Sequence, residues 1–306
     1  MALSRSGPLR PAPPAGEASL GPAVRATYDR YAADYAVHHR MQEGNLSRLA
    51  TRILARQPRL ERVLDVGAGA GATLADVVGT GDRKVWSTVA TDLSAEALRK
   101  APGHGPGQRA GVQADATRLP FAPAVFDVVY ANSVLHWVRL AGGQPGFARA
   151  VREMLRVARP GAVVAASIAG AGTAGRFLRA YRVAVRRRAP EGSPPTAVPR
   201  ADPIGSMALA PVVRTFLAAG ALDLDASLVY EPVTYAHPAD YLADARAYGY
   251  DIFLASVAPA ARQQAWEAIG EAFLADVGGG PYVHDQYMIY VVATAPPVPR
   301  GAGSGR

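Results

Sequence analysis

A glycine-rich turn after a short apolar run holds the residues with the clearest chemical meaning. Its pattern is Asp65-x-Gly67-x-Gly69-x-Gly71. Glycines at alternate positions let the backbone approach a ligand closely, with the amides of the turn facing it. Turns that seat the pyrophosphate of a dinucleotide have the different spacing G-x-G-x-x-G. An acid just before the first glycine is unsuited to a pyrophosphate. Asp65 suits the ammonium of an amino acid, or alternatively a structural contact that supports the turn and the following helix.

Two further acids follow the next two strand-like segments. Asp92 comes after 88–91, where it can accept hydrogen bonds from both hydroxyls of a ribose and would repel a 2′-phosphate. Asp115 comes after 111–114, where it can accept a hydrogen bond from the exocyclic amine of adenine. An ammonium, a ribose and an adenine are together the recognisable parts of S-adenosylmethionine.

The elements that must position these residues alternate between strand-like and helix-like patterns. This alternation predicts an α/β fold with a parallel, doubly wound sheet and crossover helices. The expected strands cover residues 62–66, 88–91, 111–114, 126–130, 162–168, 227–234 and 286–293. The expected helices cover residues 71–78, 94–100, 146–158, 172–188, 209–217, 238–248 and 259–276. The pattern indicates one sheet domain with helical insertions rather than two independent domains.

Five short motifs follow one another in an order that chance rarely produces. They are VLDVGAGAG at 63–71, ATDLS at 90–94, DA at 115–116 with LPF at 119–121, FDVV at 126–129 and RPGA at 159–162. In these motifs the chain resembles the class I S-adenosylmethionine-dependent methyltransferases, in the group with a type 11 methyltransferase domain. The resemblance covers about residues 28–169. It implies a Rossmann-like sheet of seven strands whose last strand is antiparallel.

The resemblance also implies which residues hold the cofactor, S-adenosyl-L-methionine. It assigns the glycine turn to the methionine moiety, with Asp65 near the ammonium. Asp92 would hold the ribose and Asp115 the adenine, while Asn132 would contact the cofactor near its sulfonium. The full set of expected cofactor-binding residues is Asp65, Gly67, Ala68, Gly69, Gly71, Asp92, Leu93, Asp115, Ala116 and Asn132.

The segment 131–138 would face the transferred methyl group in the resembling family. Within it, His136 is either a general base or a structural hydrogen-bonding residue, and Trp137 either contacts the acceptor or is a core aromatic. Methyl transfer is displacement at a sulfonium, already a good leaving group, so the protein mainly has to align the acceptor. A general base is needed only where the acceptor must lose its proton early.

Helical segments outside the sheet are expected to cover the site. Tyr31 and Tyr35 would share one face of a lid helix and contact the substrate. Aromatic residues of two cap insertions would either line the pocket or fill the core of the cap; they are Tyr181, Tyr235, Tyr241, Tyr248, Tyr250, Phe253 and Trp266. The expected segments are a disordered tail at 1–22, an N-terminal helical lid at 23–58, the methyltransferase domain at 59–295 with cap insertions at about 170–206 and 236–285, and a disordered tail at 296–306.

Composition limits which other kinds of site and partner the protein can have. The 306 residues include no cysteine, which excludes disulfides, thiol nucleophiles and cysteine-based metal sites, and no histidine pair has metal-ligand spacing. The net charge of +8 comes from scattered arginines apart from a cluster at 186–188, so nucleic-acid binding is not expected. Neither a membrane span nor a signal peptide is recognisable, which favours a cytoplasmic protein. The oligomeric state stays open between monomer and homodimer.

The leading hypothesis is methyl transfer to an oxygen, nitrogen or carbon of a small-molecule acceptor, for which an aromatic-rich pocket would be suited. Because a fold does not fix chemistry, a cyclase or isomerase that uses the cofactor structurally is the nearest alternative. An RNA-modifying methyltransferase is a more distant one. The glycine spacing disfavours an oxidoreductase.

Overall fold

A sheet of seven strands forms the centre of the protein, which is described by a computed structural model over residues 21–35, 40–57, 60–78, 85–100, 108–188, 207–254 and 259–297. The strand order is β3-β2-β1-β4-β5-β9-β6. The strands are β1 (Leu60–Val66), β2 (Val85–Asp92), β3 (Gln108–Gln113), β4 (Phe126–Asn132), β5 (Ala158–Ala169), β6 (Leu222–Tyr230) and β9 (Tyr287–Thr294). Only β9 of this sheet is antiparallel to its neighbours, β5 and β6. The expected Rossmann-like sheet with an antiparallel last strand is therefore confirmed.

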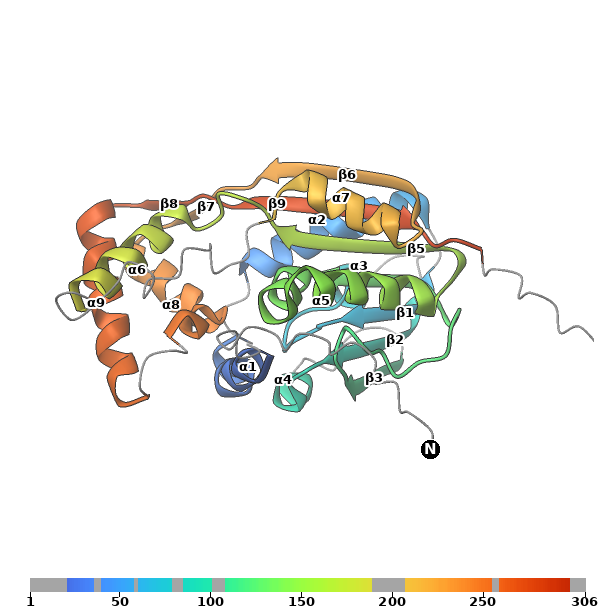
Figure 1. The fold of residues 1–306 in the computed structure, drawn as a ribbon, viewed down its shortest axis with the longest axis horizontal. Helices are drawn as coiled ribbons and strands as arrows, with labels where there is room; N and C mark the ends of the chain where they lie inside the picture. Colours follow the sequence, from blue (N-terminus) through green and yellow to red (C-terminus); the bar gives the residue numbers. More distant parts are fainter. Residues whose placement is uncertain are drawn as a thin grey trace, which may run out of the picture.

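Helices cover both faces of the sheet (Figure 1). One face packs against α5 (Leu135–Val157) and α7 (Leu209–Ala218), and the other against α2 (Arg40–Arg56) with α3 (Leu74–Val78) beside it. Alternate side chains of one strand feed the two cores: Leu64 of β1 joins the core under α5, and Val63 joins the core under α2. The short α4 (Ala95–Lys100) connects β2 to β3. None of the helices in the described segments combines the length and hydrophobicity needed to cross a lipid bilayer.

A cap lies beyond the carboxyl ends of the strands, on the left of Figure 1. It consists of α6 (Gly175–Arg188), α8 (Pro238–Ala247), α9 (Arg262–Val277), the 3-10 helices η2 (Tyr250–Leu254) and η3 (Pro259–Ala261), and the paired strands β7 (Val233–Tyr235) and β8 (Tyr282–His284). The cap has a hydrophobic core of its own. All seven aromatic residues considered for the pocket are buried in this core. Core packing is therefore their main role.

Helix α1 (Gly21–Tyr35) lies between the cap and the sheet (Figure 1). It contacts α4 and α5 on the sheet side and α8 and η2 on the cap side. Helix α2 instead buries one face against the sheet. Of the region 23–58, it is thus α1 that occupies the position of a cover, while α2 belongs to the layers of the sheet.

Two element boundaries differ from the expectations for clear local reasons. The helix expected from residue 71 begins at Leu74, because the backbone N–H and Oγ1 of Thr73 both donate to Asp76 Oδ2, at 2.7 and 2.8 Å, and so cap the helix there. The strand expected at 227–234 is two strands, β6 and β7. They are separated at Pro232, which has no N–H to pair.

Three expected helices also have different starting points. The helix expected at 146–158 begins at Leu135 and continues through a kink at Gly143, where φ is 60°. The helix expected from 172 begins at Gly175, and the helix expected from 259 begins at Arg262 after a 3-10 turn. Residues 189–206 of the first expected cap insertion and the expected tails up to residue 20 and from residue 298 lie outside the described residues.

Candidate functional site

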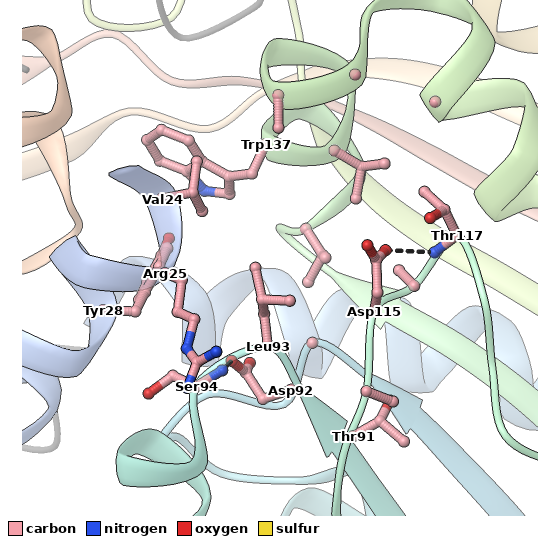
Figure 2. A pocket seen from close by; sticks show the side chains of 18 of the residues that line it. Val24, Arg25, Tyr28, Thr91, Asp92, Leu93, Ser94, Asp115, Thr117 and Trp137 are labelled. Carbon is pink, nitrogen blue, oxygen red and sulfur yellow. Dashed lines mark hydrogen bonds between the residues drawn. The ribbon is translucent and has the colours of Figure 1, made fainter. Parts of the chain in front are cut away.

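A main cavity of about 320 Å³ lies at the carboxyl ends of β1 to β4, next to α1 (Figure 2). Its walls come from α1, the glycine turn, the ends of the strands and the first half of α5. Residues that line it include Val24, Arg25, Tyr28, Gly67, Gly69, Asp92, Leu93, Asp115, Ala116, Asn132, Ser133, Trp137, Gly142 and Arg149. This volume lies in the range of small-molecule sites.

The glycine turn is held against β2 and the segment after β4. Gly67 and Gly69 have φ of 76° and 58°, in the left-handed region that favours glycine. The N–H groups of Gly67 and Ala68 donate to the Thr91 carbonyl at 2.7 and 2.9 Å. A Cβ on Gly67 would come within 2.5 Å of Val134 Cγ2. The turn therefore has no room for a side chain at its first glycine.

Asp92 ends β2 in the wall of the main cavity. Its two carboxylate oxygens accept hydrogen bonds from the backbone N–H groups of Gly69, at 2.9 Å, and Ser94, at 2.8 Å. Burial raises the pKa of the Asp92 carboxyl, although these donors act in the opposite direction. The carboxylate is thus fixed in orientation by the same turn that approaches the ligand.

Asp115 follows β3 on the neighbouring side of the cavity (Figure 2). Its Oδ1 accepts a hydrogen bond from the Thr117 N–H at 2.7 Å, which fixes the tight turn after the strand. Ala116 lines the cavity next to it, and Leu93 lines it from the end of β2. Two acids and two apolar side chains from neighbouring strand ends therefore border one space.

Asp65 lies in a different place, in a crevice of about 20 Å³ between the glycine turn and α2. It is only 2% exposed, and Tyr130 Oη donates a hydrogen bond to its Oδ2 at 2.5 Å. The same Tyr130 oxygen accepts from the Leu74 N–H at 2.8 Å, at the start of α3. Asp65 thus has the structural contact that the sequence offered as an alternative, and it also lines the crevice.

The predicted cofactor residues are divided between the two spaces. Those that line only the main cavity are Gly69, Asp92, Leu93, Asp115 and Ala116, those that line only the crevice are Asp65, Ala68 and Gly71, and those that line both are Gly67 and Asn132. The two spaces therefore meet at Gly67 and Asn132.

The turn after β4 joins these spaces to the rest of the molecule. Asn132 Nδ2 donates to the Gln42 carbonyl at 3.0 Å, and Ser167 Oγ donates to Asn132 Oδ1 at 2.6 Å. Ser133 has φ of 59°, an uncommon conformation for a residue other than glycine. Its N–H donates to Ser167 Oγ at 2.9 Å, which holds the turn in place. Such strained turns concentrate at functional sites.

His136 does not line the main cavity. It is 5% exposed, and its Nδ1 accepts a hydrogen bond from the Ala169 N–H at 3.4 Å. Burial lowers the pKa of His136 to about 3, so the imidazole is neutral at physiological pH. Its observed contact is the structural one. Trp137 does line the main cavity and meets the ring of Tyr28 edge-on, with ring centroids 6.1 Å apart.

Helix α1 reaches the main cavity with residues that the sequence did not single out. Val24, Arg25 and Tyr28 line it, whereas the side chains of Tyr31 and Tyr35 lie outside the described residues. Tyr28 lies one helical turn before Tyr31 in the same tyrosine-rich segment, so extending the periodicity backwards would have included it.

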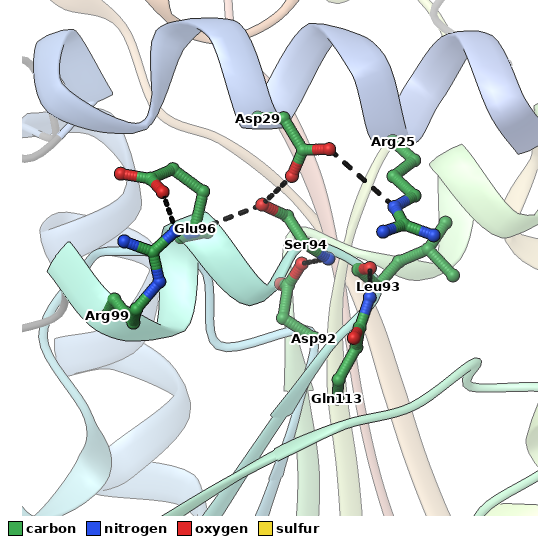
Figure 3. Close-up of polar contacts among 9 residues, drawn as sticks. Arg25, Asp29, Asp92, Leu93, Ser94, Glu96, Arg99 and Gln113 are labelled. Atoms are coloured by element: carbon green, nitrogen blue, oxygen red, sulfur yellow. Dashed lines mark hydrogen bonds and ion pairs between the residues drawn. The ribbon is translucent and has the colours of Figure 1, made fainter.

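Polar contacts hold α1 against the end of β2 (Figure 3). Ser94 Oγ donates to Asp29 Oδ1 at 2.5 Å, and Arg25 Nε lies 3.6 Å from Asp29 Oδ2. Ser94 also accepts from the Ala97 N–H at 3.0 Å and so caps α4. The helix is therefore fixed two residues from Asp92.

Sequence and structural comparisons show which known proteins the chain is similar to. Residues 64–166 match the family model of a methyltransferase domain. The chain is 32% identical over 165 residues to the malonyl-[acyl-carrier protein] O-methyltransferase of Enterobacter lignolyticus, covering 52% of this chain and 59% of the relative. It is 42% identical over 101 residues to the demethylmenaquinone methyltransferase of Beutenbergia cavernae, covering 33% of this chain and 38% of the relative. The chain thus spans less than two thirds of the length of these curated relatives.

A solved structure extends the likeness to the whole fold. The YcgJ protein from Bacillus subtilis superposes with a TM-score of 0.52 at 18% identity, covering 82% of this chain and 98% of that protein. At this identity the superposition shows the fold alone. The match over residues 64–166 identifies this region as a methyltransferase domain, and the seven-stranded sheet has the Rossmann-like fold of such domains.

Proposed function

We propose that this protein transfers the methyl group of S-adenosylmethionine to a small-molecule acceptor. The observation that carries the proposal is the main cavity, which brings the glycine turn, Asp92 and Asp115 to one space at adjacent strand ends. Open α/β sheets bind their ligands at this edge. In the proposed arrangement the ribose lies on Asp92, and the adenine lies beside Asp115 and Ala116.

The chemistry of the donor and acceptor groups fits the cofactor. Asp92 is held by two backbone N–H groups, yet each carboxylate oxygen can accept a further hydrogen bond from a ribose hydroxyl. The methionine moiety would run past Gly67 towards the crevice, where Asp65 lies. The bound cofactor supplies an activated methyl group on a sulfonium, and the protein's own residues have to align the acceptor with it.

A small acceptor is favoured by the position of the site between α1 and the first half of α5. The two relatives above are named for methylation of malonyl-[acyl-carrier protein] and of demethylmenaquinone, which supports a compact acceptor group. A cyclase or isomerase on the same fold would bind the cofactor without consuming it, so consumption of the cofactor separates the two functions.

Calorimetric titration tests the cofactor site first. S-adenosylmethionine and S-adenosylhomocysteine are expected to bind with micromolar affinity, about −8 kcal/mol, and NAD is expected not to bind. Transfer from cofactor with an isotopically labelled methyl group to a panel of small alcohols, amines and carboxylic acids would then be followed by mass spectrometry. Failure of both adenosyl compounds to bind a folded protein would contradict the proposal. Binding without any transfer would favour the structural use of the cofactor.

A further inference from the structure

A third cavity, which we call the polar chamber, lies between the ends of β4 and β5 and the cap. It has a volume of about 50 Å³. Tyr28, Ser133 and Trp137 line both the chamber and the main cavity, so the two spaces adjoin. An acceptor held in the chamber would therefore lie next to the proposed cofactor site.

Buried polar atoms without partners gather around the chamber. His284 at the end of β8 is 0% exposed, and in the described part of the chain neither of its ring nitrogens has a hydrogen-bond partner. The same holds for Oε1 of Gln42 and Oδ1 of Asn45, both on α2. The amide of Asn45 is oriented by its Nδ2, which donates to Ser133 Oγ at 3.2 Å.

Such a cluster requires an explanation, since a buried polar group left unpaired costs about 1–3 kcal/mol and is uncommon. The three residues come from two elements that are far apart in the sequence, α2 and β8, and all three line one cavity. A group that enters the chamber and forms these hydrogen bonds would recover the cost.

The charge of the chamber limits what that group can be. No described residue that lines it carries a carboxylate, an ammonium or a guanidinium. His136 and His284 both line the chamber. Burial lowers the pKa of His284 to about 4 and that of His136 to about 3, so both imidazoles are neutral at physiological pH. An ion placed there would lose its hydration without gaining a counter-charge.

Hydrogen-bonding capacity limits the group further. The amide oxygens of Gln42 and Asn45 require a donor, while a neutral imidazole offers one N–H donor and one acceptor nitrogen. A carboxylate cannot donate, and an ammonium cannot accept. A hydroxyl group does both without charge.

We propose that the polar chamber binds the hydroxyl group of an uncharged alcohol or phenol, whose oxygen accepts from the N–H of His284 and whose proton is donated to one of the two amide oxygens, of Gln42 or of Asn45. The inference rests on the proposed function, because it makes this compound the methyl acceptor. The hydroxyl oxygen would take the methyl group as its bond to the sulfonium sulfur breaks, which leaves S-adenosylhomocysteine, and the hydroxyl proton would pass to water. The aromatic rings of Tyr28, Trp137 and Tyr250 surround the chamber and suit an apolar or aromatic body.

Three matched probes test the class of acceptor. Phenol donates and accepts, anisole only accepts, and benzoate is charged. Their binding to the full chain is measured by ligand-observed NMR, with and without S-adenosylhomocysteine, while the imidazole resonances of the protein report where they bind. Phenol is expected to bind at least tenfold more tightly than anisole or benzoate and to shift the His284 resonances.

Substitutions at His284 test the assignment of its partners. His284→Phe keeps a ring of similar shape against Tyr241, whose centroid is 4.7 Å away, but removes both nitrogens. It should abolish most of the preference for phenol, and His284→Asn should restore part of it because an amide both donates and accepts. The matched control is His237→Phe, an exposed histidine before α8, which should behave as wild type.

The outcomes separate the two proposals. Affinity for S-adenosylhomocysteine should change less than twofold in His284→Phe, because His284 does not line the main cavity. Equal binding of all three probes to wild type, or a preference for phenol that survives in a folded His284→Phe, would show that the chamber holds only water and would overturn the inference. Loss of S-adenosylhomocysteine binding by wild type would instead contradict the proposed function. In that case the comparison of the three probes in the absence of S-adenosylhomocysteine would still test whether the chamber binds a hydroxyl group.

Discussion

Asp92 shows how one side chain can serve both the fold and the site. Its carboxylate receives N–H groups from the glycine turn and from the segment after β2, so it is fixed before any ligand arrives. Burial raises its pKa, and the same low-dielectric surroundings make hydrogen bonds from ligand hydroxyls stronger than they would be in water. Preorganisation of this kind lowers the entropic cost of ordering the site when a ligand binds.

Asp92→Asn is expected to weaken binding of S-adenosylmethionine at least tenfold, or about 1.4 kcal/mol. The amide nitrogen would face a backbone N–H, and the charge that strengthens the ribose contact would be lost. Calorimetry on a variant with a native circular dichroism spectrum measures the effect. Glu96→Gln is the matched control, because Glu96 pairs with Arg99 on α4 and does not line the cavity. Wild-type affinity in folded Asp92→Asn would refute the ribose assignment.

The buried histidines make a prediction about stability. The pKa values of His136 and His284 are about 3 and 4 in the folded protein, below the ordinary value of about 6.5. Between these values the unfolded chain binds more protons than the folded one, so the free energy of unfolding falls as the pH is lowered. Each histidine contributes a slope of up to about 1.4 kcal/mol per pH unit.

Removal of one imidazole should make that decline shallower. Urea unfolding of His136→Phe at a series of pH values between about 6 and about 4.5 should show a slope lower by close to one proton than wild type. The overall stability of the variant can differ, since the contact with Ala169 is lost, but the slope reports the titration alone. An unaltered slope in His136→Phe would mean that this residue is not buried in its neutral form.

At the scale of elements, the glycine turn and the segment after β4 fit against each other without spare room. Gly67 combines a φ of 76° with the close approach of Val134, while Gly142 in α5 lines the same cavity with nothing within 4 Å of an added Cβ. The two glycines therefore form a matched pair for substitution: both line the main cavity, but only Gly67 has a left-handed backbone and a close neighbour.

Gly67→Ala should lower the free energy of unfolding by about 1–3 kcal/mol and weaken cofactor binding, since the left-handed conformation and the contact with Val134 are both unfavourable for a Cβ. Gly142→Ala should be neutral or slightly stabilising, because alanine favours helices. Chemical denaturation and calorimetry on both variants measure the difference. Equal stability of the two would show that the turn is more adaptable than its geometry indicates.

Much of this element-scale arrangement could be predicted from the sequence, because the relevant signals are local. The turn, Asp92 and Asp115 each follow a short apolar strand within a few residues, and parallel strands bring such ends together. The start of α5 was missed, since Gly142, Gly143 and Pro145 interrupt its helical pattern. The chamber residues were missed for a different reason. His284 is isolated in the sequence, and only the packing of the cap against the sheet brings it near α2.

At the scale of the whole molecule, α1 connects parts that otherwise have separate cores. It contacts α4 and α5 through one side and α8 and η2 through the other, and Arg30 pairs with Asp251 of the cap at 3.6 Å. A ligand under α1 would therefore act on the cap as well as on the sheet. A ligand that binds only the folded state raises the free energy of unfolding by about 2.7 kcal/mol when its free concentration is about a hundred times the dissociation constant.

Hydrogen exchange should reveal this connection. S-adenosylhomocysteine is expected to slow exchange in the glycine turn, in α1 and also in α8 and η2. In Asp29→Ala, which removes the partner of Ser94, the protection of α1 and the cap should decrease while that of the turn remains. Protection confined to residues 60–170 of the wild-type protein would show that α1 does not couple the two parts.

The turn at 132–134 has a consequence for how the proposed methyltransferase can diversify. Asn132 borders the crevice and the main cavity, and Ser133 borders the main cavity and the chamber, so a change in this turn would disturb several functions together. Tyr248, Tyr250 and His284 border the chamber from the cap and do not line the main cavity. Natural selection could therefore exchange one acceptor for another through mutations of the cap, while the inherited cofactor chemistry passes unchanged to the descendants.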